Sequence, residues 1–273
     1  MLKIFKQIKK LTKAMTKTIC IIILIISVLQ IFILSVFAES EFVENYYQKV
    51  TYSINENGDT YGTDAQSLTV GYEADLILAV GENNIVGYVK ATDLNDDVSS
   101  PLEAQNRGTN NTTKYIPLYS SDGETIIDEF VLTLDAQERV SPKSVVEYVY
   151  GSEGYINVNN HYTCTTRSAI SDCTNGVRGK TRIVADKKVE NGWLGVQVRI
   201  YRASDNALVD SSSFEYNSSN VSFWEYDIFH YTIKTKEAYY CKGVVKTWNP
   251  DISNYWTTGT FASPNVNPTI INP

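Results

Sequence analysis

The stretch GVQVRIYR, residues 195–202, is the strongest strand signal in the chain. Its residues alternate with the two-residue period of a β-strand, so Val196, Val198 and Ile200 are expected on one face. The opposite face carries Gln197, Arg199 and Tyr201. The turn ASDN and the return run ALVDSSSFEYN follow directly. The stretch therefore predicts a β-hairpin and, with it, a β fold.

Similar signals follow it towards the C-terminus. YDIFHYTI alternates in the same way, and YYCKGVVKTWN and YWTTGTF read as a final pair of strands. Several short strands at regular spacing, separated by turns, are typical of a β-sandwich. We therefore expect a β-sandwich-like module over residues 155–263, followed by a flexible tail over 264–273 that is rich in Pro and Asn.

Hairpin signals also fill the chain before this module. Asn57-Gly58 and Asp122-Gly123 are turn dipeptides between alternating runs, because such turns need residues that tolerate positive φ. They predict an N-terminal β-hairpin or small-barrel-like module over 41–134. Residues 135–154 read as a linker with a possible short helix from Ser141-Pro142. The expected fold class is mostly β, with two small antiparallel β modules.

A short helix is expected within the first module. Ser100-Pro101-Leu102-Glu103 has the spacing of a capping box, in which Glu follows the capping Ser by three positions. Pro at the first helical position strengthens the signal, because its fixed φ suits a helix start.

The first 38 residues have the organisation of a secretory signal peptide. Six lysines and no acidic residue precede the apolar run ICIIILIISVLQIFILSVFA, and Val36 and Ala38 are the small residues that a signal peptidase reads. An uncleaved anchor remains the alternative, because the run nearly reaches the roughly 20 residues that span a bilayer. In both cases the remainder is expected outside the cell, secreted or associated with the cell wall.

The charge balance excludes some partners. The chain has 24 Lys and Arg against 31 Asp and Glu, a net charge of −7, and loss of the six leader lysines would make it −13. An acidic chain repels nucleic acid and anionic lipid. We therefore expect no nucleic-acid partner, and membrane contact only through an uncleaved N-terminal segment.

Three cysteines follow the leader, so one disulfide at most can form within the chain. Cys164–Cys173 would close the short loop CTTRSAISDC and is the first candidate, although all three pairings are open. Cys241 lies in an apolar strand pattern and is expected to be a buried free thiol. A Cys164 nucleophile assisted by His161 is the weaker alternative.

The chemical motifs are mostly negative evidence. The chain has two histidines, and zinc-protease, serine-hydrolase and thiol-redox motifs are missing from the sequence. The Gly179-Lys180-Thr181 run lacks the glycine five positions earlier that a phosphate loop requires. We therefore assign no catalytic residue, no metal and no cofactor. A hydrolase that uses two carboxylates stays open, because such pairs meet only through the fold.

Aromatic residues provide the one positive signal. TWNPDISNYW places Trp248, Tyr255 and Trp256 close together in the sequence. Exposed flat rings can stack on sugar faces or anchor a protein interface. The three rings are the candidate binding surface, and packing into the sandwich core is the alternative.

Five segments carry a family resemblance: NENGDTYGT with EADLILAVGENNIVGYVKATDL, YIPLYSSDGETIIDEFVL, GVQVRIYRASDNALVDSSSFEYNSS and AYYCKGVVKTWN. They resemble small exported proteins of Gram-positive bacteria that have no assigned activity, so the resemblance implies export and no catalytic residues.

The expected function is a secreted, non-enzymatic β protein that binds cell-wall glycan or a surface protein. The alternatives are a small carboxylate-dependent hydrolase and a toxin or immunity component.

Overall fold

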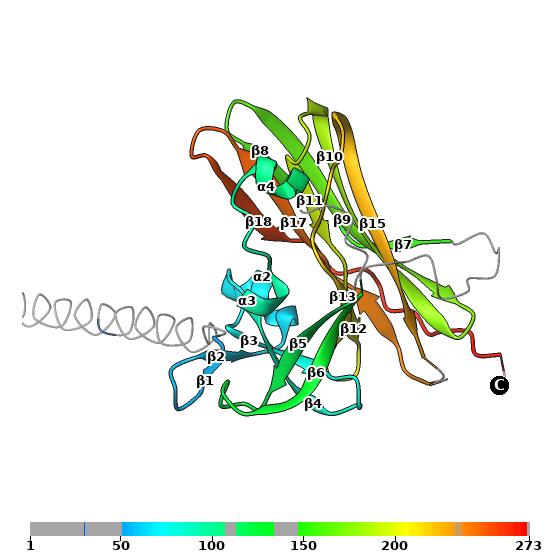
Figure 1. The fold of residues 1–273 in the computed structure, drawn as a ribbon. Helices are drawn as coiled ribbons and strands as arrows, with labels where there is room; N and C mark the ends of the chain where they lie inside the picture. The colour runs from blue at the N-terminus through cyan, green and yellow to red at the C-terminus, as the bar shows by residue number, and fades with distance from the viewer. Residues whose placement is uncertain are drawn as a thin grey trace, which may run out of the picture. The chain divides into compact units, whose positions relative to one another are not determined.

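The computed structural model describes Gln30 and residues 51–106, 113–133, 147–232, 234 and 236–271. Apart from Gln30, these residues belong to one compact unit, Thr51–Pro273. The predicted cleavage site and the possible helix start at Ser141-Pro142 lie outside the described residues. The mostly β expectation is confirmed, with 53% of the described residues in strands, 9% in helices, and several antiparallel sheets (Figure 1).

Five strands of a nine-stranded sheet close into a small barrel. They are β3 (Leu76–Val80), β4 (Val86–Lys90), β5 (Lys114–Tyr119), β6 (Ile126–Thr133) and β13 (Leu208–Ser212). Each pairs with the next, and β13 returns to pair with β3 in parallel. Ile77, Phe130 and Leu132 fill the interior and are at most 1% exposed. The barrel therefore takes four strands from the predicted N-terminal module and one from the C-terminal module.

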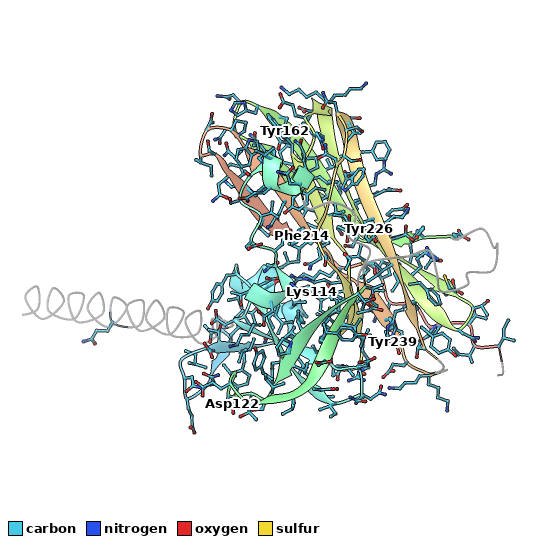
Figure 2. The ribbon with its side chains drawn as sticks, in the orientation of Figure 1. Lys114, Asp122, Tyr162, Phe214, Tyr226 and Tyr239 are labelled. Carbon is cyan, nitrogen blue, oxygen red and sulfur yellow. The ribbon has the colours of Figure 1, made fainter. Side chains whose placement is uncertain are left out.

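The β5–β6 hairpin shows how the sequence sets its turn. Asp122 lies at the hairpin tip (Figure 2), where its carboxylate accepts hydrogen bonds from the backbone N–H groups of Glu124 and Thr125, both at 2.9 Å. Gly123 adopts the positive φ of 74° that this turn requires. The Asp-Gly pair thus fixes the register that places Phe130 and Leu132 inside the barrel.

The remaining strands of the nine-stranded sheet extend it on both sides. They are β1 (Ser53–Ile54), β2 (Thr60–Gly62), β12 (Arg199–Arg202) and β16 (Tyr239–Cys241). The helices are short: η1 (Asp64–Gln66), α2 (Ser67–Val70), α3 (Ala91–Leu94) and α4 (Pro101–Asn106). Within the described ranges, the helices are too short or too polar to cross a membrane.

The predicted helix after Ser100 is confirmed as α4. The Glu103 N–H donates to Ser100 Oγ at 3.3 Å. The Glu103 carboxylate in turn accepts from the Ser99 N–H at 2.8 Å, one position earlier than the simplest capping box requires.

Two further sheets form the sandwich. The five-stranded sheet contains β7 (Val149–Tyr150), β8 (Gly154–Val158), β9 (Tyr162–Cys173), β10 (Gly176–Val189) and β15 (Val221–Tyr231). The four-stranded sheet contains β11 (Leu194–Gln197), β14 (Glu215–Tyr216), β17 (Val244–Asn249) and β18 (Asn254–Gly259). Ile183, Val196 and Val245 join one buried cluster between the sheets, so the sandwich core draws on both. The predicted flexible tail, residues 264–273, is described as far as residue 271, and this part forms two isolated bridges to the rest of the fold.

The stretch 194–202 links the sandwich to the barrel sheet. Its first part is β11 in the four-stranded sheet and its second part is β12 in the nine-stranded sheet, with Val198 between them. Both faces are buried: Val196, Val198 and Ile200, but also Gln197, Arg199 and Tyr201, are each 0% exposed. The polar face is therefore an interior surface, which sequence alternation could not distinguish from a solvent face.

Candidate functional site

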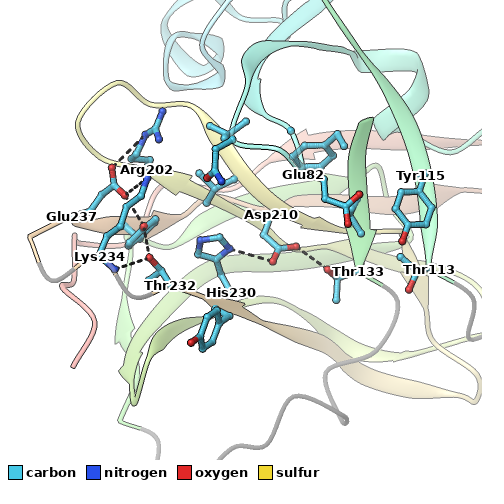
Figure 3. A pocket seen from close by; sticks show the side chains of 18 residues that line it. Glu82, Thr113, Tyr115, Thr133, Arg202, Asp210, His230, Thr232, Lys234 and Glu237 are labelled. Carbon is cyan, nitrogen blue, oxygen red and sulfur yellow. Dashed lines mark hydrogen bonds and ion pairs between the residues drawn. The ribbon is translucent and has the colours of Figure 1, made fainter. Parts of the chain in front are cut away.

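A cavity of about 610 Å³ lies between the outer face of the barrel and the C-terminal end of β15 (Figure 3). Glu82 reaches it from the β3–β4 turn and Tyr115 from β5. Thr133 from β6, Asp210 from β13 and His230 from β15 also line it. The segment after β15 completes the wall with Thr232, Lys234 and Glu237. Strands far apart in the sequence thus supply one set of polar side chains.

The centre of the pocket is a chain of three polar groups. His230 Nδ1 lies 3.4 Å from Asp210 Oδ2, and the Thr133 hydroxyl donates to Asp210 Oδ1 at 2.9 Å. The side chains of His230 and Asp210 are 18% and 11% exposed. Asp210 therefore orients the imidazole and favours a proton on Nδ1, which leaves Nε2 on the far side of the ring from Asp210 (Figure 3).

One end of the pocket is a neutralised charge cluster. Glu237 lies 3.6 Å from Arg202 Nε and 3.4 Å from Lys234 Nζ, and it accepts a hydrogen bond from Tyr239 at 2.8 Å. Arg202 is also bound by Asp205 at 2.7 and 3.0 Å. Burial raises the pKa of Tyr239 to about 12, so its hydroxyl stays a neutral donor. These cations are already paired and cannot strongly attract an anion.

The opposite end is more open. Glu82 is exposed, and its carboxylate has no hydrogen bond or ion pair with any residue that the structure describes. Tyr115 exposes 52% of its surface and lines the same pocket. This end thus offers an incoming molecule an aromatic ring and a carboxylate that has no partner among the described residues.

The three aromatic residues predicted as a binding surface do not share one face. Trp248 pairs with Tyr255 across β17 and β18, and their rings make an edge contact with centroids 5.2 Å apart. Tyr255 is 8% exposed, whereas Trp256 points to the opposite face and packs against the sandwich core. Neighbouring residues of a strand point to opposite faces, so the predicted single surface does not form.

The predicted Cys164–Cys173 disulfide also needs correction. Both cysteines lie on β9, nine residues apart, which corresponds to roughly 30 Å along an extended strand. A disulfide requires Cα atoms about 4.4–6.8 Å apart. Cys164, Cys173 and Cys241 are all free and buried.

The alternative of a Cys164 nucleophile does not fit the structure either. Burial raises the pKa of Cys164 to about 12, which suppresses the reactive thiolate. His161 bonds Asp251 at 2.7 Å instead.

Basic side chains on β10 form ion pairs with the neighbouring strand. Arg178 bonds Asp227 at 2.6 Å and Lys180 bonds Glu225 at 3.0 Å, both on the neighbouring strand β15. Gly179-Lys180-Thr181 lies within β10 and not in a loop that could surround a phosphate. Within the described ranges, no group of three His, Cys, Asp or Glu side chains could hold a metal ion.

A second charged cluster, which we call the buried network, lies on the polar side of β12. Lys242 Nζ lies 2.8 Å from Asp64 Oδ2, with side chains 3% and 1% exposed. The Tyr201 hydroxyl donates to the same oxygen at 2.7 Å. Arg199, 0% exposed, forms an ion pair with Glu73 and donates to Asn95 at 3.1 Å. This network holds the η1–α3 segment against β12 and β16.

The sequence reasoning missed the His230–Asp210 pair. A signal existed, because His230 alternates with the inward positions Tyr226 and Ile228 of β15, and a histidine at such a position needs a polar partner. The partner could not be named, since Asp210 lies on another strand 20 residues earlier.

Comparisons with models of protein families, with curated proteins and with solved structures found no match for this chain. The resemblance to small exported Gram-positive proteins therefore stays a prediction. Any function must be argued from the pocket itself.

Proposed function

We propose that this chain is an exported binding protein that acts at the cell wall and takes its ligand in the pocket around His230. The observation that carries the proposal is the cavity of about 610 Å³ with convergent polar side chains. Small-molecule sites typically occupy about 300–1,000 Å³ and use a few placed polar groups. The lysine-rich leader and its apolar run support the export part of the proposal.

Binding accounts for the pocket better than catalysis does. Its described lining contains no serine or cysteine that could act as a nucleophile. Asp210 and Glu237 are held by hydrogen bonds and ion pairs, an arrangement that favours fixed recognition groups. A glycan hydrolase is the second candidate. Asp210 orients His230 through a hydrogen bond, and a histidine that acts as a general base is oriented in the same way. That candidate requires release of soluble fragments from cell walls, and the release must stop in His230→Asn.

The test is retention of the purified protein on insoluble cell walls. Val131 is half-buried, lines the pocket and pairs with Tyr115, so Val131→Trp would fill the cavity without crowding the barrel interior. Val184→Trp is the matched control, because Val184 is also a half-buried strand residue but lies on β10 outside the pocket. Urea unfolding of both variants checks that they fold.

We expect the wild type and Val184→Trp to be retained and Val131→Trp to be lost. Equal retention of Val131→Trp would show that the pocket is not the site. Failure of the wild type to bind walls would end the proposal.

A further inference from the structure

We infer that the ligand of this pocket is a neutral saccharide, an inference that rests on the proposed binding function. The pocket combines three carboxylates, one oriented imidazole and two exposed tyrosine rings, Tyr115 and Tyr231. Four classes of molecule could meet such a site at a cell wall: saccharides, peptides, anionic polymers and cations. The geometry distinguishes among them.

The balance of donors and acceptors favours a ligand rich in hydroxyl groups. An ionised carboxylate can only accept hydrogen bonds, so Glu82, Asp210 and Glu237 require donors from their surroundings. Asp210 and Glu237 receive several of these from the protein, whereas the described residues give none to Glu82. A saccharide carries a donor on nearly every ring carbon. A peptide backbone offers one N–H per residue.

The charges oppose an anionic polymer. Arg202 and Lys234 are the cations of the lining, and Glu237 contacts both while Asp205 holds Arg202 a second time. Glu82 would face the polymer directly, and the chain as a whole has a net charge of −7. Phosphate oxygens also accept hydrogen bonds without donating any, so they would leave the carboxylates without partners.

Exposed rings give the pocket a flat surface that can cover the face of a sugar, and because a cation can lie over the same surface, the putrescine probe decides between the two. Tyr115 exposes 52% of its surface on β5 and lines the same pocket as Glu82, whose carboxylate has no partner among the described residues (Figure 3). A flat ring can cover the C–H face of a sugar while neighbouring carboxylates bind the hydroxyls at its edge. The pair would thus hold both the face and the edge of one sugar ring.

The experiment is competition for wall retention with four soluble probes. Neutral chains of N-acetylglucosamine are the glycan probe, and peptides released from the walls by an amidase are the second probe. Inorganic polyphosphate and putrescine are the anionic and cationic probes. Tyr115→Ala removes the ring, Tyr115→Phe keeps it, and Tyr155→Ala is the control, because Tyr155 is 67% exposed on β8 outside the pocket.

We expect only the glycan chains to displace the protein, and Tyr115→Ala to bind about tenfold more weakly, the scale of one lost stacking contact. Tyr115→Phe and Tyr155→Ala should bind like the wild type. Displacement by peptides, polyphosphate or putrescine, or full binding by Tyr115→Ala, would overturn the saccharide inference. Loss of retention in Val131→Trp would still support the pocket as the site, so the two proposals fail separately.

Discussion

The buried network and the pocket are two clusters of charged side chains that differ in their access to solvent. In the buried network the Lys242 and Asp64 side chains are 3% and 1% exposed. In the pocket the His230 and Asp210 side chains are 18% and 11% exposed and line a cavity. Each includes a charged residue on a strand of the nine-stranded sheet, Arg199 on β12 and Asp210 on β13. The cavity, and not the presence of charge, is therefore the reason why we propose the pocket, and not the buried network, as the binding site.

The largest effect on the free energy of unfolding is expected at Lys242. Lys242→Met should lower the free energy of unfolding by about 3–5 kcal/mol, because Asp64 would remain as an uncompensated buried charge. Urea unfolding measures the loss. The exposed control Lys187→Met should stay within about 0.5 kcal/mol. The double variant Asp64→Asn, Lys242→Met should recover part of the loss, and a loss under about 1 kcal/mol in Lys242→Met would contradict the assigned role.

Acid should weaken the same network by a smaller amount. Burial acts to raise the pKa of Asp64, but Lys242 and Arg199 outweigh it, so the pKa lies below its ordinary value. A carboxyl with a lowered folded pKa stabilises the protein above the unfolded pKa of about 3.9, and this contribution disappears as the pH falls through the folded value. Urea midpoints at pH 7 and pH 3 should therefore differ less in Asp64→Asn than in the wild type. Equal differences between the two urea midpoints in both proteins would show that Asp64 does not cause the loss of stability in acid.

A substitution at the centre of the pocket should lower stability less than Lys242→Met and should also weaken wall retention. His230→Asn loses the contact with Asp210, and we expect a stability loss of about 1 kcal/mol together with weaker wall retention. Urea unfolding and the wall pull-down measure the two effects on one preparation. A loss as large as that of Lys242→Met would show that the histidine supports the fold and does not serve a ligand.

The smallest effect on stability is expected at Glu82. Glu82→Gln should change the free energy of unfolding by no more than about 0.5 kcal/mol, because the side chain is exposed and forms no bond with a described residue. Wall retention should nevertheless fall, since an amide accepts hydrogen bonds less strongly than a carboxylate. Glu129→Gln is the matched control, an exposed glutamate on β6 outside the pocket lining. Equal retention of the two variants would remove Glu82 from the site.

The local structure was predictable, whereas most of the long-range structure was not. Asp122-Gly123 and Ser100-Pro101 indicate a hairpin and a helix through the backbone conformations that they favour, and both are present. Closure of the barrel by β13 was not predictable, because the alternation of residues in a strand does not indicate which other strands pair with it. The burial of Arg199 was missed for the same reason, since the residues that bind its side chain, Glu73 and Asn95, lie more than 100 positions away in the sequence.

The candidate site was harder to predict than the fold. Trp248 and Trp256 stood out because large rings are rare, yet alternation along β17 and β18 sends them to opposite faces. His230 and Asp210 looked ordinary, because an isolated histidine or aspartate in a strand carries no motif. Their proximity depends on the packing of β15 beside β13, which no local pattern encodes.

The position of β13 in the barrel has a consequence for biosynthesis. The chain leaves the ribosome from its N-terminus, so β3–β6 emerge long before residues 208–212 can close the ring. Until then the apolar side chains around Phe130 have no complete enclosure, and the unpaired strand edges are open to wrong partners. A nascent chain stopped before residue 208 should remain sensitive to protease. The N-terminal strands would then reach a stable fold only after residues from the second half of the sequence pair with them.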